Sequence, residues 1–63
     1  MNKGLLNIKD TAEMLNVSVS WLYQKVGRRE IPFVRMGRAL RFDMDEIERW
    51  VETQKYAVRQ ETR

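Results

Sequence analysis

The chain has 63 residues and a formal net charge of +3, and it contains neither Cys nor His. It therefore has room for one small domain, and it excludes zinc-finger, thiol and histidine general-base chemistry, because all of these need Cys or His. No apolar run approaches the roughly 20 residues of a membrane helix, so we expect no membrane partner. The absence of Cys fits a cytoplasmic protein.

A first helix is expected to begin at Ile8, with Asn7 as its N-cap. Ile8, Ala12 and Leu15 follow one another at i, i+4 and i+7 and form one apolar stripe. Asn16 predicts the end of this helix, because Asn tolerates the left-handed conformation that closes many helices. The two leucines before Asn7 are expected to lead into the helix.

Only two residues separate this helix from the next N-cap, Ser18. Two short helices joined by so tight a turn indicate a helix-turn-helix at about residues 8–28. At 100° per residue, Leu22 and Val26 point inward, and Val19 lies near the same apolar side, where we expect it mainly to pack. Ser18 and the nearby backbone N–H groups offer a phosphate site at the start of the second helix.

The outward side of the second helix carries groups suited to contact DNA. They are Ser20, Trp21, Tyr23, Gln24, Lys25 and Arg28. Gln can bind adenine bidentately, Arg pairs with guanine, and aromatic edges can pack on a thymine methyl group. Three of them have alternatives: Trp21 could fold back onto the hairpin as core, Tyr23 could be half-buried with only its hydroxyl exposed, and Gln24 could be an ordinary solvated residue.

A β-hairpin is predicted at about residues 33–42, after a proline that forbids helical continuation. Gly37 and Arg38 form its two-residue turn, and in that register Phe33 faces Phe42. A narrow minor groove attracts an inserted Arg, and a slender tip that carries Arg38 has the shape to enter it. The alternative is a solvated arginine in a turn. The candidate DNA contacts of this wing are Arg35, Arg38 and Arg41.

A third helix is predicted at about residues 44–58, with Asp43 as its N-cap and a polar tail to the end of the chain. Ile47, Trp50 and Val51 form its inward stripe. The carboxylates near its start are accounted for by capping and by the helix dipole. We therefore expect no catalytic residues, no metal and no cofactor.

The charge is concentrated between the second helix and the hairpin. Residues 18–42 hold six basic residues against one acid, Glu30, which gives +5, whereas the remaining residues hold six basic residues against eight acids, which gives −2. Such asymmetry is expected of a surface that faces a polyanion. The alternative is a basic stretch that is merely solvated.

Three segments carry a family resemblance: NVSVSWLY at the turn and second helix, IPFVRMGR at the hairpin, and LRFDMDEIERWV leading into the last helix. In this order and spacing they resemble the excisionase family of MerR-like winged helix-turn-helix domains, over about residues 5–51. Val19 stands where the family often has Arg, and Arg29 replaces the usual glycine after the second helix. The resemblance implies DNA-contact positions at Ser18, Ser20, Tyr23, Gln24 and Arg38.

The sequence therefore predicts a single α+β domain over residues 1–63, a small winged helix-turn-helix with three helices and a two-stranded hairpin wing between the second and third. The resemblance implies an excisionase-like recombination directionality factor that binds and bends attachment-site DNA, with an integrase as partner. A small prophage-type transcriptional regulator would use the same fold and chemistry. A third alternative is a protein-interaction module without a DNA role. Since one small module neutralises few phosphates, we expect a free monomer that binds tandem sites on double-stranded DNA cooperatively.

Overall fold

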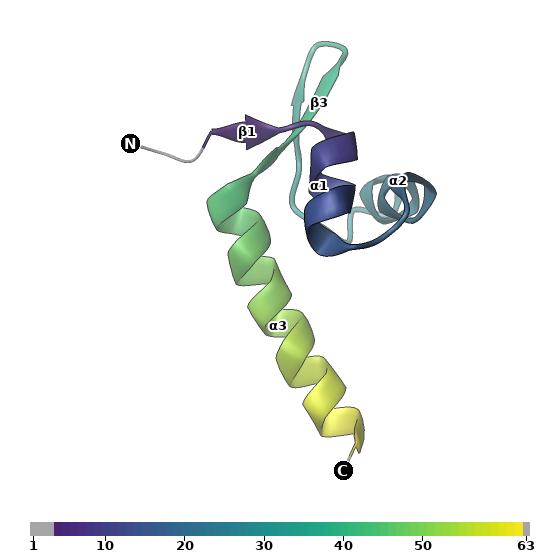
Figure 1. Ribbon diagram of the computed structural model, residues 1–63, viewed down its shortest axis with the longest axis vertical. Helices are drawn as coiled ribbons and strands as arrows, with labels where there is room; N and C mark the ends of the chain where they lie inside the picture. Colours follow the sequence, from purple (N-terminus) through teal and green to yellow (C-terminus); the bar gives the residue numbers. More distant parts are fainter. Residues whose placement is uncertain (1–3, 63) are drawn as a thin grey trace.

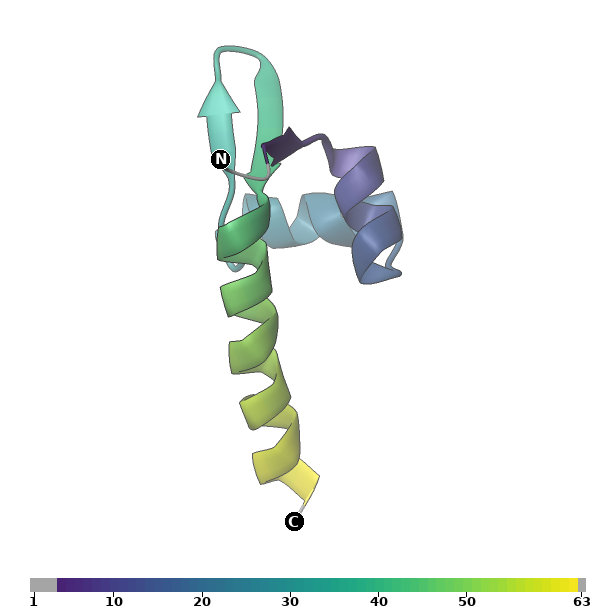
Figure 2. The ribbon, with the colours of Figure 1, turned by 60° about the vertical axis from the view of Figure 1, so that its left-hand side comes forward.

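Three helices and a small antiparallel sheet make up the fold, which the computed structural model describes for the backbone of residues 4–62 and the side chains of residues 4–55. In chain order (Figure 1) the elements are β1 (Leu5–Leu6), α1 (Ile8–Leu15), α2 (Val19–Gly27), β2 (Val34–Met36), β3 (Ala39–Asp43) and α3 (Met44–Thr62). This arrangement confirms the predicted winged helix-turn-helix fold. Figure 2 shows the β2–β3 hairpin and α3 projecting in opposite directions from the α1–α2 pair.

The ends of α1 follow from two asparagines, as predicted. The side chain of Asn7 accepts a hydrogen bond of 2.7 Å from the backbone N–H of Asp10, which satisfies one of the orphan donors at the start of the helix. Asn16 adopts the left-handed conformation, with φ 60° and ψ 46°. The next N–H, of Val17, donates to the carbonyl of Ala12 at 3.0 Å, the long-range bond of a Schellman ending.

The start and end of α2 are each held by a small set of local bonds. Ser18 Oγ accepts a hydrogen bond of 3.0 Å from the N–H of Trp21, which confirms Ser18 as the N-cap. The helix ends at Gly27, and the left-handed residue that follows is Arg29, with φ 57°. Arg29 thus adopts the left-handed conformation at a helix end, a position where glycine is usual.

The sheet has one strand more than predicted. The strand order is β1-β3-β2, and β1 pairs antiparallel with β3, with Leu6 opposite Phe42. The expectation of a two-stranded hairpin was therefore incomplete. A strand of two residues shows no alternation of apolar and polar positions, so periodicity does not reveal it. Its partner edge on β3 exists only once the chain has folded back.

The hairpin forms as predicted, with Gly37 at a φ of 62° and Arg38 beside it in the turn. Its antiparallel pairs are Val34 with Arg41, Arg35 with Leu40 and Met36 with Ala39. One further step in this register places Phe33 opposite Phe42, although Phe33 lies before the first residue of β2. Phe42 is fully buried and Phe33 packs at the edge of the core, so the hairpin is anchored to the helices through its base.

Every helix contributes to the hydrophobic core. Its buried apolar side chains are Ala12, Leu22, Val26, Ile31, Phe42 and Ile47. Leu22, Val26 and Ile47 are therefore inward-facing, as predicted. The indole N–H of Trp50 donates to the carbonyl of Glu30 at 3.0 Å and ties α3 to the segment after α2.

α3 is longer than the predicted 44–58. It begins after Asp43, whose side chain accepts a hydrogen bond of 2.9 Å from the N–H of Asp45, as expected of an N-cap. It runs to Thr62, because the polar residues that follow residue 58 include the good helix formers Arg, Gln and Glu. Within the part of the chain that the structure describes, no helix is both long and apolar enough to cross a membrane.

Candidate nucleic-acid interface

One side of α2 is polar and exposed. Ser20, Tyr23, Gln24 and Arg28 are all exposed, and Tyr23 keeps 55% of its surface in contact with solvent. Leu22 lies on the opposite side of the helix and is fully buried. The helix therefore presents a phenol, a hydroxyl, an amide and a guanidinium outward, as the 100° spacing predicted. Of the alternatives weighed for Tyr23, the exposed one is observed.

Trp21 lies on the side of α2 that faces α3. It is partly buried, packs at the edge of the core and shares a hollow with Trp50 and Gln54 of α3. Trp21 is thus packed, as the alternative held, but beside α3 and not on the hairpin, and this leaves less of its ring for DNA than the sequence predicted. The cause is α3, whose position relative to α2 the local sequence does not specify.

Lys25 occupies the same side and is engaged within the chain. Its Nζ lies 3.1 Å from a carboxylate oxygen of Glu30 and 5.1 Å from the centroid of the Trp21 ring. The ion pair is exposed to solvent, but together with the ring contact it occupies the ammonium group, which leaves Lys25 fewer free hydrogen bonds for a phosphate. Among the side chains predicted to contact DNA, Lys25 is for this reason one of the less available.

Val19 is exposed over 37% of its surface, so the prediction that it mainly packs was wrong. A helical projection gives the direction of a side chain but not the extent of the neighbours that cover it. Val19 is the first residue of α2, and the buried residues of this helix, Leu22 and Val26, lie further along it. An apolar surface is therefore left open beside Ser20.

The three arginines of the hairpin differ in how exposed they are. Arg38 is exposed in the turn at the tip, and Arg35 is exposed on β2 with its guanidinium carbon 6.0 Å from the centroid of the Phe33 ring. Arg41 is only partly exposed, and its Nη1 donates to the carbonyl of Leu40 at 2.8 Å. Arg35 and Arg38 thus retain more hydrogen-bonding capacity for a ligand than Arg41 does.

A hollow of about 330 Å³ separates α2 from β2, and we call it the α2–β2 hollow. It is lined by Val26, Gly27, Arg29, Phe33 and Arg35. Sequence reasoning did not assign Arg29 to the interface, although Arg29 lies within the +5 segment and stands where the resembled family has glycine. Those two observations were the signal that could have identified it.

The basic side chains of α2, of the loop after it and of the hairpin form a surface that we call the cationic face. Within residues 4–55, most of these side chains have no acidic partner. Within residues 4–55, the Lys25–Glu30 pair is the single ion pair that involves a basic residue of α2, the loop after it or the hairpin. The N-cap and first half of α3, by contrast, are acidic, with five carboxylates and one guanidinium over residues 43–52. The chain therefore separates a cationic face from an anionic helix, which would orient it on a polyanion.

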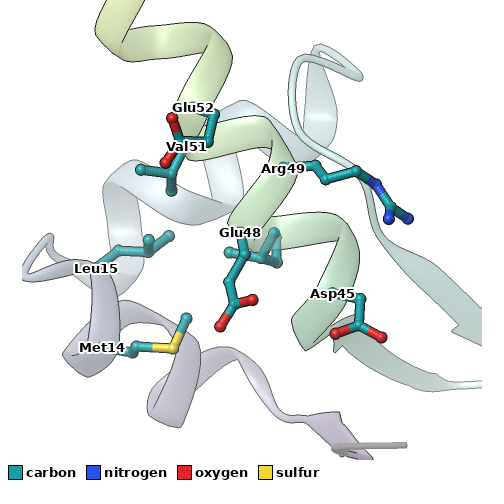
Figure 3. Close-up of a pocket in the computed structure, with 8 residues that line it drawn as sticks. Met14, Leu15, Asp45, Glu48, Arg49, Val51 and Glu52 are labelled. Carbon is teal, nitrogen blue, oxygen red and sulfur yellow. The ribbon is translucent and has the colours of Figure 1, made fainter.

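A wider groove of about 620 Å³ lies between α1 and α3 (Figure 3). Met14 and Leu15 of α1 face Val51 of α3 across it, and the carboxylates of Glu48 and Asp45 border it. Acidic side chains outnumber basic ones along this groove, so it repels phosphate and does not belong to the cationic face. Among the described residues, no cluster of three or more Asp or Glu side chains has an arrangement that could hold a metal ion.

Comparison with protein-family models matches residues 5–55 to a family described as a helix-turn-helix domain. The matched span contains α1, α2, the hairpin and the first part of α3, and so every residue of the cationic face. Comparisons with curated proteins and with solved structures gave no match.

Proposed function

The chain belongs to the helix-turn-helix domain family, and from this premise we propose that it binds double-stranded DNA with α2 in the major groove and the β2–β3 hairpin against the minor groove. The observation that carries the proposal is the exposed polar side of α2 beside a hairpin whose arginines have no acidic partner within residues 4–55. The major groove of B-DNA admits an α-helix, and exposed guanidinium groups neutralise phosphates.

Roles for the individual residues follow from their chemistry. Gln24 and Arg28 would read base edges, because an amide pairs with adenine and a guanidinium with guanine. Ser18 lies at the start of α2, where backbone N–H groups and the helix dipole favour a phosphate. Arg38 at the hairpin tip would enter the minor groove, where the negative potential is strongest when the groove is narrow.

We further propose that the protein acts by binding alone, as an excisionase-like recombination directionality factor that bends attachment-site DNA and works with an integrase. The support is the resemblance of the turn, wing and last-helix segments to excisionases. A hairpin that projects from the helices can contact the DNA strand beyond the groove that α2 occupies, and such a two-groove grip favours a bent duplex.

The test is a fluorescence-anisotropy titration of duplex DNA at several salt concentrations. Neutralisation of roughly four or five phosphates predicts a log–log salt slope of about −4. A slope near zero would refute DNA binding and would favour the protein-interaction module, because an apolar protein contact is insensitive to salt.

The biological role is tested by footprinting on DNA that flanks the gene. Several closely spaced sites, with bending measured by the mobility of circularly permuted fragments, are expected for a directionality factor. A single unbent site that overlaps a promoter would contradict that role and indicate a transcriptional regulator.

A further inference from the structure

Gly27, at the end of α2, has no reason within the chain to be glycine. The positive φ angles of the described residues belong to Gly4, Asn16, Arg29 and Gly37, so Gly27 has a backbone conformation open to any residue. A Cβ placed on Gly27 would meet no heavy atom within 4 Å. Because Ala is a much better helix former than Gly, the chain gives up stability at this position without a gain in packing.

Gly27 lies on the polar side of α2. It follows Tyr23 by four residues and Gln24 by three, and residues at these spacings share one side of a helix. All three are exposed. Gly27 also lines the α2–β2 hollow together with Arg29 and Arg35. The residue without a side chain is therefore placed where the base-reading side of the helix meets the hairpin.

The hollow concentrates positive charge. Neither Arg29 nor Arg35 has a carboxylate partner among the side chains of residues 4–55. Arg35 is held next to the hollow by its contact with the ring of Phe33, which also lines it. Arg29 and Arg35 carry like charges and line the same small hollow, so an anion bound there would interact favourably with both.

We propose that the α2–β2 hollow binds one phosphodiester group of the DNA strand that borders the major groove. Arg29 and Arg35 donate to the phosphate oxygens, and guanidinium groups suit this geometry because they donate through a planar fork. Gly27 lets the sugar–phosphate chain come into contact with the helix backbone, a position that a Cβ would occupy. This proposal rests on the proposed DNA-binding function and adds a defined phosphate site to it. It explains the glycine at position 27 by the close approach of the DNA backbone.

The first test measures the melting temperature and the DNA affinity of Gly27→Ala and of the parent protein. We expect the melting temperature to rise and the affinity to fall. The variant should melt at a temperature about 2–8 °C higher, since the substitution improves helix propensity and disturbs no neighbour. It should nevertheless bind a duplex of random sequence about tenfold more weakly, a loss comparable to that of one charge-assisted contact. A variant that binds as tightly as the parent would overturn the proposal.

The second test addresses the charges and does not depend on the folding of Gly27→Ala. Arg35→Ala should weaken binding to all sequences evenly and reduce the salt slope by about one unit, as expected for one phosphate contact. Arg49→Ala removes the same charge from α3 and is the matched control, with an unchanged slope. An Arg35→Ala slope equal to that of the control would contradict the proposal.

Methylphosphonate substitution, one phosphate at a time, identifies the group that is bound. At one position the neutral linkage should weaken binding by the parent more than binding by Arg35→Ala, because the variant has already lost one of the two guanidinium contacts to that phosphate. Equal losses for both proteins at every position would overturn the proposal. If the parent binds DNA but the Gly27→Ala, Arg35→Ala and methylphosphonate experiments do not give the expected losses, only the inference about the hollow is refuted. If the parent binds no DNA, the proposed function itself is refuted.

Discussion

Replacing Arg29 by glycine should stabilise the free protein, because Arg29 closes α2 in the left-handed conformation, with φ 57°. A residue with a Cβ occupies this region at a cost of about 1–2 kcal/mol. The backbone bonds around it do not depend on the side chain. The N–H of Arg29 donates to the carbonyl of Val26 at 3.0 Å, and the N–H of Glu30 donates to that of Lys25 at 2.9 Å. Arg29→Gly would keep both bonds.

The magnitude is a difference of two effects. Glycine removes the conformational cost, but it gives the unfolded chain additional freedom worth about 0.4–1 kcal/mol. The midpoints of these two ranges give an expected net gain in the free energy of unfolding of about 0.8 kcal/mol. For a domain of this size that gain raises the melting temperature by about 2–8 °C. Arg29→Ala keeps the Cβ and removes the charge, so its stability should stay near that of the parent.

Urea unfolding of the parent and the two variants, followed by far-UV circular dichroism, measures the difference directly. Repeating the titrations at high salt removes the contribution of surface charge, which screening weakens. If Arg29→Gly proves no more stable than Arg29→Ala, the backbone at residue 29 is not strained, and the explanation for the end of α2 is wrong. Both variants should lose affinity for DNA, since both remove the charge of Arg29, a residue that lines the α2–β2 hollow.

Three further predictions follow from the core, the interface and the size of the domain. Leu22 is fully buried, so Leu22→Ala should cost about 2–5 kcal/mol and can unfold the domain, and a thermal melt identical to that of the parent would contradict the core described above. Gln24→Ala should lose about 1–3 kcal/mol of discrimination at one base pair, whereas Arg38→Ala should weaken all sites more evenly, with some loss of preference for A·T flanks. Selection from random duplexes distinguishes these two, and unchanged selectivity of Gln24→Ala would exclude it as a base-reading residue. The free protein should sediment as a monomer and fill two adjacent sites cooperatively, so a tight free dimer or independent filling of the sites would disprove the tandem arrangement.

The local features of the fold were predictable because each depends on a few neighbouring residues. Asn7 and Ser18 accept hydrogen bonds from the N–H groups three residues later, as N-caps do. Asn16 adopts the left-handed conformation that its side chain tolerates, and Gly37 begins the hairpin turn with a positive φ. These are matters of backbone sterics and short-range bonding, which the residue types alone express.

Features that depend on contacts between distant segments were missed or left open. β1 exists because Leu6 finds Phe42 across the sheet, and a two-residue strand has no pattern of its own. The indole of Trp50 reaches the carbonyl of Glu30 over a separation of 20 residues, which no local motif indicates. Such contacts form only when the helices and the sheet pack together.

The sequence by itself determined that residues 18–42 form a strongly basic segment, that this segment contains a capped helix and a hairpin, and that Ser20, Gln24 and Arg28 share one side of the helix. Only the tertiary structure decided which other sides of α2 are covered. Trp21 shares a hollow with Trp50 and Gln54 of α3, and Gly27 shares another with Arg35 of the hairpin. The physical reason is that helical periodicity sets the directions in which the side chains of one helix point. The packing of distant elements then decides which of those side chains stay accessible to a ligand.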